Sequence, residues 1–185
     1  MAKTSSNMIP LGTIAPDFNL MDTCSNNNIS LKNYQSTVAT VIMFICNHCP
    51  FVKLIQSKLV EVVSEYQKKG IQFIAINSND ISHYPEDRPE KMREVASELH
   101  FTFPYLYDET QEVAKAYQAA CTPDFYVFDS ALKCVYRGRF DEATPGNGIA
   151  VTGKDLTNTL DAILRQQEIN PEQFPSVGCN IKWKT

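Results

Sequence analysis

The sequence predicts an α/β fold in which a central mixed β-sheet is flanked by helices. An almost wholly apolar run over residues 38–45 has the composition of a strand that is buried on both faces. A segment with apolar residues at helical spacing follows it directly, and residues 71–77 form a second strand-like run. Strand, helix and strand in this order build a right-handed crossover unit with two parallel strands.

Length and composition indicate one domain with a substantial core. The chain has 185 residues, 43% of them hydrophobic, and only 7 glycines. We expect an N-terminal extension over residues 1–13, a main domain over residues 14–168 and a C-terminal tail over residues 169–185.

The charge pattern argues against two classes of partner. The net charge is −4 at pH 7 and the isoelectric point is near 5.4, with lysines and arginines scattered along the chain. Such a surface attracts neither nucleic acid nor an anionic membrane.

The N-terminus lacks the apolar run of a signal peptide, and no stretch approaches the roughly 18 apolar residues of a spanning helix. We therefore expect a cytoplasmic protein whose 6 cysteines are mostly thiols.

Each element of the first half has a local signal. Residues 15–20 and 29–31 flank a turn-rich stretch and predict a short hairpin ahead of the main fold. The helix after the central strand is expected to begin at Pro50 and to stop at Gly70. Its apolar stripe is Phe51, Ile55, Leu59, Val62 and Tyr66.

The second half begins with the polar, proline-containing stretch 78–90, whose acidic residues 86–90 we interpret as a solvated loop and helix cap. A helix is expected over residues 92–99, and a short strand over residues 105–107. Asp108 and Gln111 then have the spacing of a capping box before another helix.

The last third of the chain predicts the closure of one sheet edge. Residues 125–128 and 133–137 form an antiparallel hairpin, and a final helix over residues 156–164 covers it. The remaining residues, 170–185, contain two prolines and no periodic pattern, so we expect an irregular tail.

Cys46 and Cys49 stand where the central strand becomes a helix. At a helix start, the unpaired backbone N–H groups and the positive end of the dipole stabilise an anion, here the thiolate of Cys46. The thiolate is the reactive form, so we expect Cys46 to be the nucleophile, with a pKa below that of an ordinary cysteine. His48 adds to this effect if it is protonated or hydrogen-bonds the Cys46 sulfur. Cys49, followed by Pro50, is then the resolving thiol that attacks a mixed disulfide.

Five motifs carry a resemblance to a known family. Residues 12–18, Gly-Thr-Ile-Ala-Pro-Asp-Phe, look like the opening of the alkyl hydroperoxide reductase/thiol-specific antioxidant (AhpC/TSA) superfamily. The other four motifs together resemble thioredoxin-like redoxins with a Cys-x-His-Cys site; they are residues 44–53, 84–87, 122–125 and 178–183. The resemblance implies the thioredoxin fold over residues 14–167.

This resemblance implies further site residues. In the thioredoxin fold the proline corresponding to Pro123 is cis and its loop faces the cysteine pair, so Thr122 is expected to offer its backbone to an extended substrate. Asn47 and Pro50, beside the cysteines, are further candidates for substrate contact.

Two more cysteines are candidate accessory thiols. Cys121 lies just before Pro123 and is expected near the site, although a buried cysteine often serves only as a small apolar residue. Cys179, in the tail, is a candidate to fold back and resolve a sulfenate on Cys46 or Cys49. The alternative is a tail that is merely docked by Ile181 and Trp183.

The leading functional hypothesis is a thiol–disulfide oxidoreductase with a role in redox homeostasis. It needs no cofactor or metal beyond the redox-active pair Cys46 and Cys49, and it acts on protein or small-molecule disulfides with an unidentified electron donor.

Two alternatives stay open. One is a thiol peroxidase that reduces hydroperoxides; here the proline and threonine of the peroxiredoxin motif are replaced by Ile42 and Cys46. The other is a non-enzymatic metal-binding domain, in which Cys46, His48, Cys49 and Cys121 hold copper(I), zinc or an iron–sulfur cluster.

Overall fold

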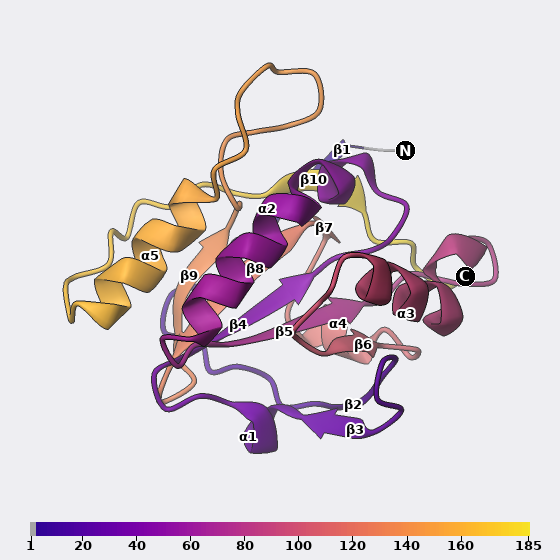
Figure 1. Cartoon of the computed structure of the whole chain (residues 1–185), viewed down its shortest axis with the longest axis horizontal. Coiled ribbons are helices and arrows are strands. Elements are labelled where there is room, and N and C mark those ends of the chain that lie inside the picture. The colour runs from indigo at the N-terminus through magenta and orange to yellow at the C-terminus, as the bar shows by residue number, and fades with distance from the viewer. Residues whose placement is uncertain (1–2) are drawn as a thin grey trace.

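A seven-stranded mixed sheet forms the centre of the computed structural model, which describes residues 3–185, in the order β3-β2-β6-β5-β4-β8-β9 (Figure 1). Its strands are β2 (Asn19–Asp22), β3 (Asn28–Ser30), β4 (Ala39–Phe44), β5 (Gln72–Asn77), β6 (Tyr105–Tyr107), β8 (Asp124–Asp129) and β9 (Cys134–Gly138). β5 runs parallel to both β4 and β6, whereas the other neighbours are antiparallel. The predicted mixed sheet and both predicted hairpins are therefore confirmed, except that the first hairpin joins the central sheet through β6 and does not form a separate extension.

Helices lie on both faces of this sheet. They are α1 (Leu31–Tyr34), α2 (Pro50–Gln67), α3 (Pro89–Glu98), α4 (Glu112–Ala116) and α5 (Lys154–Leu164), with a short 3₁₀ helix at Pro85–Asp87. α2 and α5 contribute to one apolar cluster, and Figure 1 shows α2 crossing β4 and β8 with α5 beside β9. Ala114 of α4 belongs to the cluster on the other face. Within residues 3–185, no helix combines the length and apolar character needed to cross a membrane.

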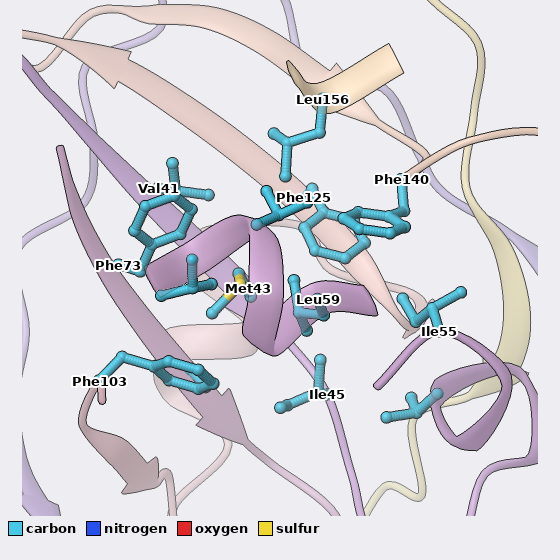
Figure 2. Packing of buried hydrophobic residues seen from close by; sticks show 14 of the residues in the cluster. Val41, Met43, Ile45, Ile55, Leu59, Phe73, Phe103, Phe125, Phe140 and Leu156 are labelled. Carbon is cyan, nitrogen blue, oxygen red and sulfur yellow. The ribbon is translucent and has the colours of Figure 1, made fainter. Parts of the chain in front are cut away.

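The two faces of β4 explain why its sequence shows no alternation. Val41 and Met43 belong to the cluster that includes Leu59 of α2, as Figure 2 shows, whereas Ile42 and Phe44 point into the cluster on the opposite face. A strand covered on both faces has no solvent-facing positions, so every residue is apolar or small. β4 is accordingly buried along its whole length.

The start and stop of α2 agree with the sequence signals. Cys49 is the N-cap residue in an extended conformation, Pro50 is the first helical residue, and Lys53 N–H donates to the Cys49 carbonyl oxygen at 3.0 Å. The chain leaves the helix through Gly70, whose φ of +88° favours glycine. Cys49 and Pro50 are thereby fixed at the start of a long helix.

The predicted capping box before α4 is wrong. Gln111 itself is the N-cap residue, in the left-handed region with φ 64°, and the Asp108 carboxylate accepts from Ala114 N–H at 2.9 Å. The Gln111 side chain instead donates to the carbonyl oxygen of Lys182 at 2.7 Å. Tertiary contacts with the C-terminal tail thus replace the local hydrogen bond that the spacing predicted.

The C-terminal tail is irregular as predicted except over four residues, which form a strand that the sequence analysis did not expect. A strand from each chain end, β1 (Lys3–Ser5) and β10 (Val177–Asn180), forms a second, antiparallel sheet with β7 (Cys121–Thr122) from the middle of the chain, in the order β1-β10-β7. Residues 1 and 2 of the expected N-terminal extension lie outside the described residues. A Cβ atom at Gly178 would overlap the Thr122 carbonyl group, so this strand approaches β7 as closely as a glycine allows.

Candidate active site

The cysteine pair lies directly against the loop that precedes β8. Cys46 is 2% exposed and Cys49 is fully buried. Thr122 contacts both: its hydroxyl oxygen lies 3.3 Å from Cys46 Sγ, and its carbonyl oxygen lies 3.3 Å from Cys49 Sγ. The Thr122–Pro123 peptide bond is cis, as the resemblance implied. The structure therefore brings the two cysteines and the cis-proline loop together.

His48 is bonded to Asp87 and not to Cys46. Its Nδ1 atom lies 2.6 Å from Asp87 Oδ2, and its ring stacks on Tyr84 with the centroids 5.2 Å apart. Its Nε2 atom is buried and finds no hydrogen-bond partner among residues 3–185. The expected hydrogen bond from His48 to the Cys46 sulfur is thus replaced by one to a carboxylate.

Asp87 is the site residue that the sequence analysis missed. We expected it in a solvated acidic run, but it is fully buried and accepts hydrogen bonds from the Asn47 backbone N–H at 2.7 Å and from Asn79 Nδ2 at 2.8 Å. Burial by itself would raise the pKa of this carboxyl, but the hydrogen bonds from His48, Asn79 and Asn47 outweigh burial and lower it. The available signal was its place in the Tyr-Pro-Glu-Asp motif.

The two predicted substrate contacts beside the cysteines differ from each other. Asn47 is engaged within the protein, because its Nδ2 donates to the Glu86 carbonyl at 2.8 Å and its Oδ1 accepts from the Tyr105 hydroxyl at 3.0 Å. These two hydrogen bonds hold the loop between the cysteines. Pro50, in contrast, is exposed at the first position of α2.

The two cysteines of the pair have opposite pKa shifts. The pKa of Cys46 is raised well above its ordinary value by its hydrogen bond with Cys49, by burial and by the nearby Asp87 carboxylate. The pKa of Cys49 is lowered from 9.0 to about 5, chiefly because Cys46 hydrogen-bonds its sulfur; burial opposes this shift and Cys179 supports it.

The sequence analysis expected the lowered pKa at Cys46, whereas the hydrogen bond between the two sulfurs here lowers the pKa of Cys49. α2 begins at Pro50, so the positive end of the helix is closest to its N-cap residue, Cys49. The negative charge of Asp87 lies on the side of Cys46 and opposes a second negative charge there. The spacing of the motif alone does not show which sulfur the helix start favours.

Cys179 is brought into the site by β10. Its Sγ lies 2.8 Å from Cys49 Sγ, and the residue is only 3% exposed. Burial, together with its hydrogen bond to Cys49, raises the pKa of Cys179 to about 12. None of these three sulfurs is joined in a disulfide bond in this structure.

The same strand occupies the edge that Thr122 was expected to offer to a substrate. In the register of β10 and β7, Cys179 is paired with Thr122 and Asn180 with Cys121. In this state the chain pairs with itself there, and a substrate contact with the Thr122 backbone stays a prediction.

Cys121, the other accessory candidate, has different surroundings. It is fully buried on β7, and its sulfur lies 3.9 Å from the Pro123 carbonyl oxygen. Burial is the main cause that raises its pKa. This is the environment of a small buried apolar residue.

The tail beyond β10 is tied to the network around Asp87. Lys182 N–H donates to Asn79 Oδ1 at 2.8 Å, and Ile181 N–H donates to the Ala120 carbonyl at 3.0 Å. Ile181 is buried as expected, but Trp183 is 40% exposed. The tail therefore belongs to the structure of the site.

One group of side chains in residues 3–185 has the spacing of a metal site. A Cys46 sulfur, a His48 nitrogen and an Asp87 oxygen all lie within 4.8 Å of one another. This set differs from the one expected, since it lacks Cys49 and Cys121. Both Asp87 oxygens already accept hydrogen bonds from protein groups, so the arrangement is satisfied as a hydrogen-bond network.

A cavity of about 540 Å³ opens beside the motif. Asn47 and His48 form one wall, and the others come from the 3₁₀ helix, from α2 and from α3 with its C-cap residue Leu99. A space of this size, apolar in part and rimmed by charges, is suited to a small ligand or a peptide side chain.

Comparison with known proteins places the chain in a family. A sequence model described as the AhpC/TSA family matches residues 11–137. A comparison with curated proteins gives no significant match.

Solved structures match nearly the whole chain. An uncharacterized conserved protein from Geobacillus kaustophilus is 58% identical with a TM-score of 0.98, and the match covers 100% of this chain and 97% of that one. A hypothetical protein from Sinorhizobium meliloti is 45% identical with a TM-score of 0.95, covering 98% and 99%. The thioredoxin domain of a thiol-disulfide oxidoreductase from Bacteroides vulgatus is 17% identical with a TM-score of 0.59, covering 70% and 88%, and shows the shared fold alone.

Proposed function

Because this chain belongs to the AhpC/TSA family and has a thioredoxin-like fold, we propose that it is a thiol–disulfide oxidoreductase that cycles a Cys46–Cys49 disulfide. The observation that carries the proposal is the position of both sulfurs against Thr122, at the start of α2. A thiol with a pKa of about 5 at this place is a thiolate at neutral pH. The substrates are protein or small-molecule disulfides.

The first step uses both cysteines. In the reduced site the Cys46 thiol donates to the Cys49 thiolate. When a substrate disulfide reaches Cys46, the proton passes to Cys49, the Cys46 sulfur bonds one substrate sulfur, and the other leaves as a thiolate.

The second step closes the protein disulfide. Cys49 returns the proton to the departing thiolate and attacks the Cys46 sulfur, so that the second substrate sulfur leaves as a thiolate. Two electrons pass from the cysteine pair to the substrate. His48 and Asp87 act as positioning residues, because Asp87 fixes both the His48 ring and the Asn47 amide of the loop between the cysteines.

The test is disulfide reduction by single cysteine variants. With dithiothreitol as electron donor and a protein disulfide as substrate, Cys46→Ser is expected to lose turnover. Cys49→Ser is expected to accumulate a mixed disulfide between Cys46 and the substrate, which mass spectrometry detects. Cys24→Ser is the matched control, because Cys24 is exposed in the turn after β2.

Retained turnover by Cys46→Ser would sink the assignment. Rapid oxidation of the pair by a hydroperoxide, without turnover of any disulfide, would favour the thiol-peroxidase alternative instead. A stoichiometric metal that blocks alkylation of Cys46 after anaerobic purification would favour metal binding.

A further inference from the structure

A third sulfur is in place to react with the proposed redox pair. The 2.8 Å between Cys179 Sγ and Cys49 Sγ is shorter than the roughly 3–3.5 Å of a near-attack geometry. By contrast, Cys121 has its sulfur against the Pro123 carbonyl, although it lies on the neighbouring strand. Among the accessory candidates, contact with the pair is specific to Cys179.

The position of Cys179 is fixed from both sides along the chain. Before it, Gly178 lies so close to the Thr122 carbonyl that no side chain fits between them. After it, Ile181 and Lys182 are hydrogen-bonded to Ala120 and Asn79. The thiol therefore needs no ordering of a flexible tail before it reacts.

β10 also stands at the strand edge beside the cysteine pair, where an extended substrate would add by main-chain pairing. A strand in this position presents its cysteine to the pair as a substrate would. The chain thus places its own thiol, that of Cys179, where a substrate strand would place a cysteine.

We propose that Cys179 is a third redox-active thiol, which takes over the disulfide formed by Cys46 and Cys49 and holds it as a Cys49–Cys179 disulfide. This inference rests on the proposed function, because Cys46 and Cys49 must first be oxidised by a substrate.

The step is an intramolecular thiol–disulfide exchange. The Cys179 sulfur attacks Cys49 Sγ; the Cys49–Cys179 bond forms and the Cys46–Cys49 bond breaks. The proton of Cys179 ends on the Cys46 sulfur. One disulfide replaces another within the chain, so no external oxidant or reductant is consumed.

The exchange has a chemical consequence. Cys46 becomes a thiol again while the protein still holds the oxidation in a bond between two buried residues. That bond links the start of α2 to β10. It therefore keeps the three-stranded sheet β1-β10-β7 attached to the site in the oxidised state.

The experiment follows the redox state of Cys46. Reduced protein is mixed with a stoichiometric amount of oxidised glutathione, quenched with acid, denatured and alkylated, and the peptides are analysed by mass spectrometry. In the wild type we expect the Cys49–Cys179 peptide and an alkylated Cys46. In Cys179→Ser we expect Cys46 to be joined to Cys49 and protected from alkylation.

Two further variants sharpen this result. Cys121→Ser replaces an equally buried cysteine on the paired strand and is expected to behave as the wild type. Cys46→Ser retains Cys49 and Cys179, and is expected to form their disulfide on oxidation even if Cys179→Ser fails to fold.

The failures of the two proposals are distinguishable. If Cys46 is protected equally in the wild type and in Cys179→Ser, and Cys46→Ser forms no Cys49–Cys179 disulfide, the inference is overturned and the proposed Cys46–Cys49 couple stands. If Cys46 is alkylated in the wild type and in Cys179→Ser, and no disulfide forms in any of the proteins, the proposed function fails as well.

Discussion

Cys46 and Cys49 belong to one short motif, yet their surroundings are opposite. Cys46 lies on the side of Asp87, the buried carboxylate that follows β5 and holds His48, and its pKa is raised. Cys49 stands at the start of α2 and lies against Cys179 of β10, and its pKa is lowered to about 5. The difference shows that the pKa of each cysteine in such a pair depends on which segments of the chain contact its sulfur.

The largest expected effect concerns the titration of the pair. The reduced wild type should form one thiolate with a midpoint near pH 5 instead of 9.0, measured by ultraviolet thiolate absorbance. Cys46→Ala removes the hydrogen-bond donor to Cys49, so the midpoint should rise. Cys46→Ser keeps a hydroxyl donor and should raise the midpoint less. Equal midpoints in the wild type, Cys46→Ala and Cys46→Ser would contradict the role given to the hydrogen bond from Cys46.

The same shift predicts the pH dependence of stability. The pKa of Cys49 is lower in the folded protein than the 9.0 of an ordinary thiol, so its thiolate stabilises the folded reduced form fully above pH 9.0. This contribution shrinks as the pH falls and is absent below about 5. Urea unfolding of the wild type and of Cys49→Ser across this range measures it, as a difference that grows with rising pH.

A third prediction tests the surroundings of Cys49. Gly178→Ala places a methyl group on the Thr122 carbonyl, so β10 must move. By analogy with overpacked sites, we expect a loss of about 3 kcal/mol in the free energy of unfolding. Val177→Ala, on the same strand, is the control and should cost less. A Gly178→Ala protein with wild-type stability would mean that β10 does not hold this register.

A fourth prediction tests the surroundings of Cys46. Asp87→Asn removes the negative charge that opposes the Cys46 thiolate, so the pKa of Cys46 should fall. The loss of charged hydrogen bonds to His48 and Asn79 should lower the free energy of unfolding by about 2 kcal/mol. Glu86→Gln removes the same charge from the exposed neighbour and should change neither quantity. An equal effect of the two variants on the Cys46 titration would show that the contact with Asp87 is unimportant.

Much of the fold could be predicted because its signals are local. The apolar run of β4, the proline at the start of α2 and the hairpin of β8 and β9 each depend on residues close together in the chain. The cysteine pair could be placed at the strand–helix junction for the same reason. The resemblance to the redoxins added the cis-proline loop, which no local pattern indicates.

Other features could not be predicted because they join distant residues. Cys49 and Cys179 are separated by 130 positions, and His48 and Asp87 by 39. Nothing in the polar stretch around Asp87 shows that its carboxylate is buried, and nothing in the tail shows that Gly178 fits against Thr122.

The sequence by itself determined the main strands and helices of the central sheet and which cysteines stand at a helix start, because hydrophobic periodicity and helix capping act over a few residues. Only the tertiary structure decided which sulfur is stabilised as a thiolate, which accessory thiol reaches the pair and which carboxylate holds His48. These depend on burial and on charges and hydrogen-bond partners that the folded chain brings together from its two ends and its middle.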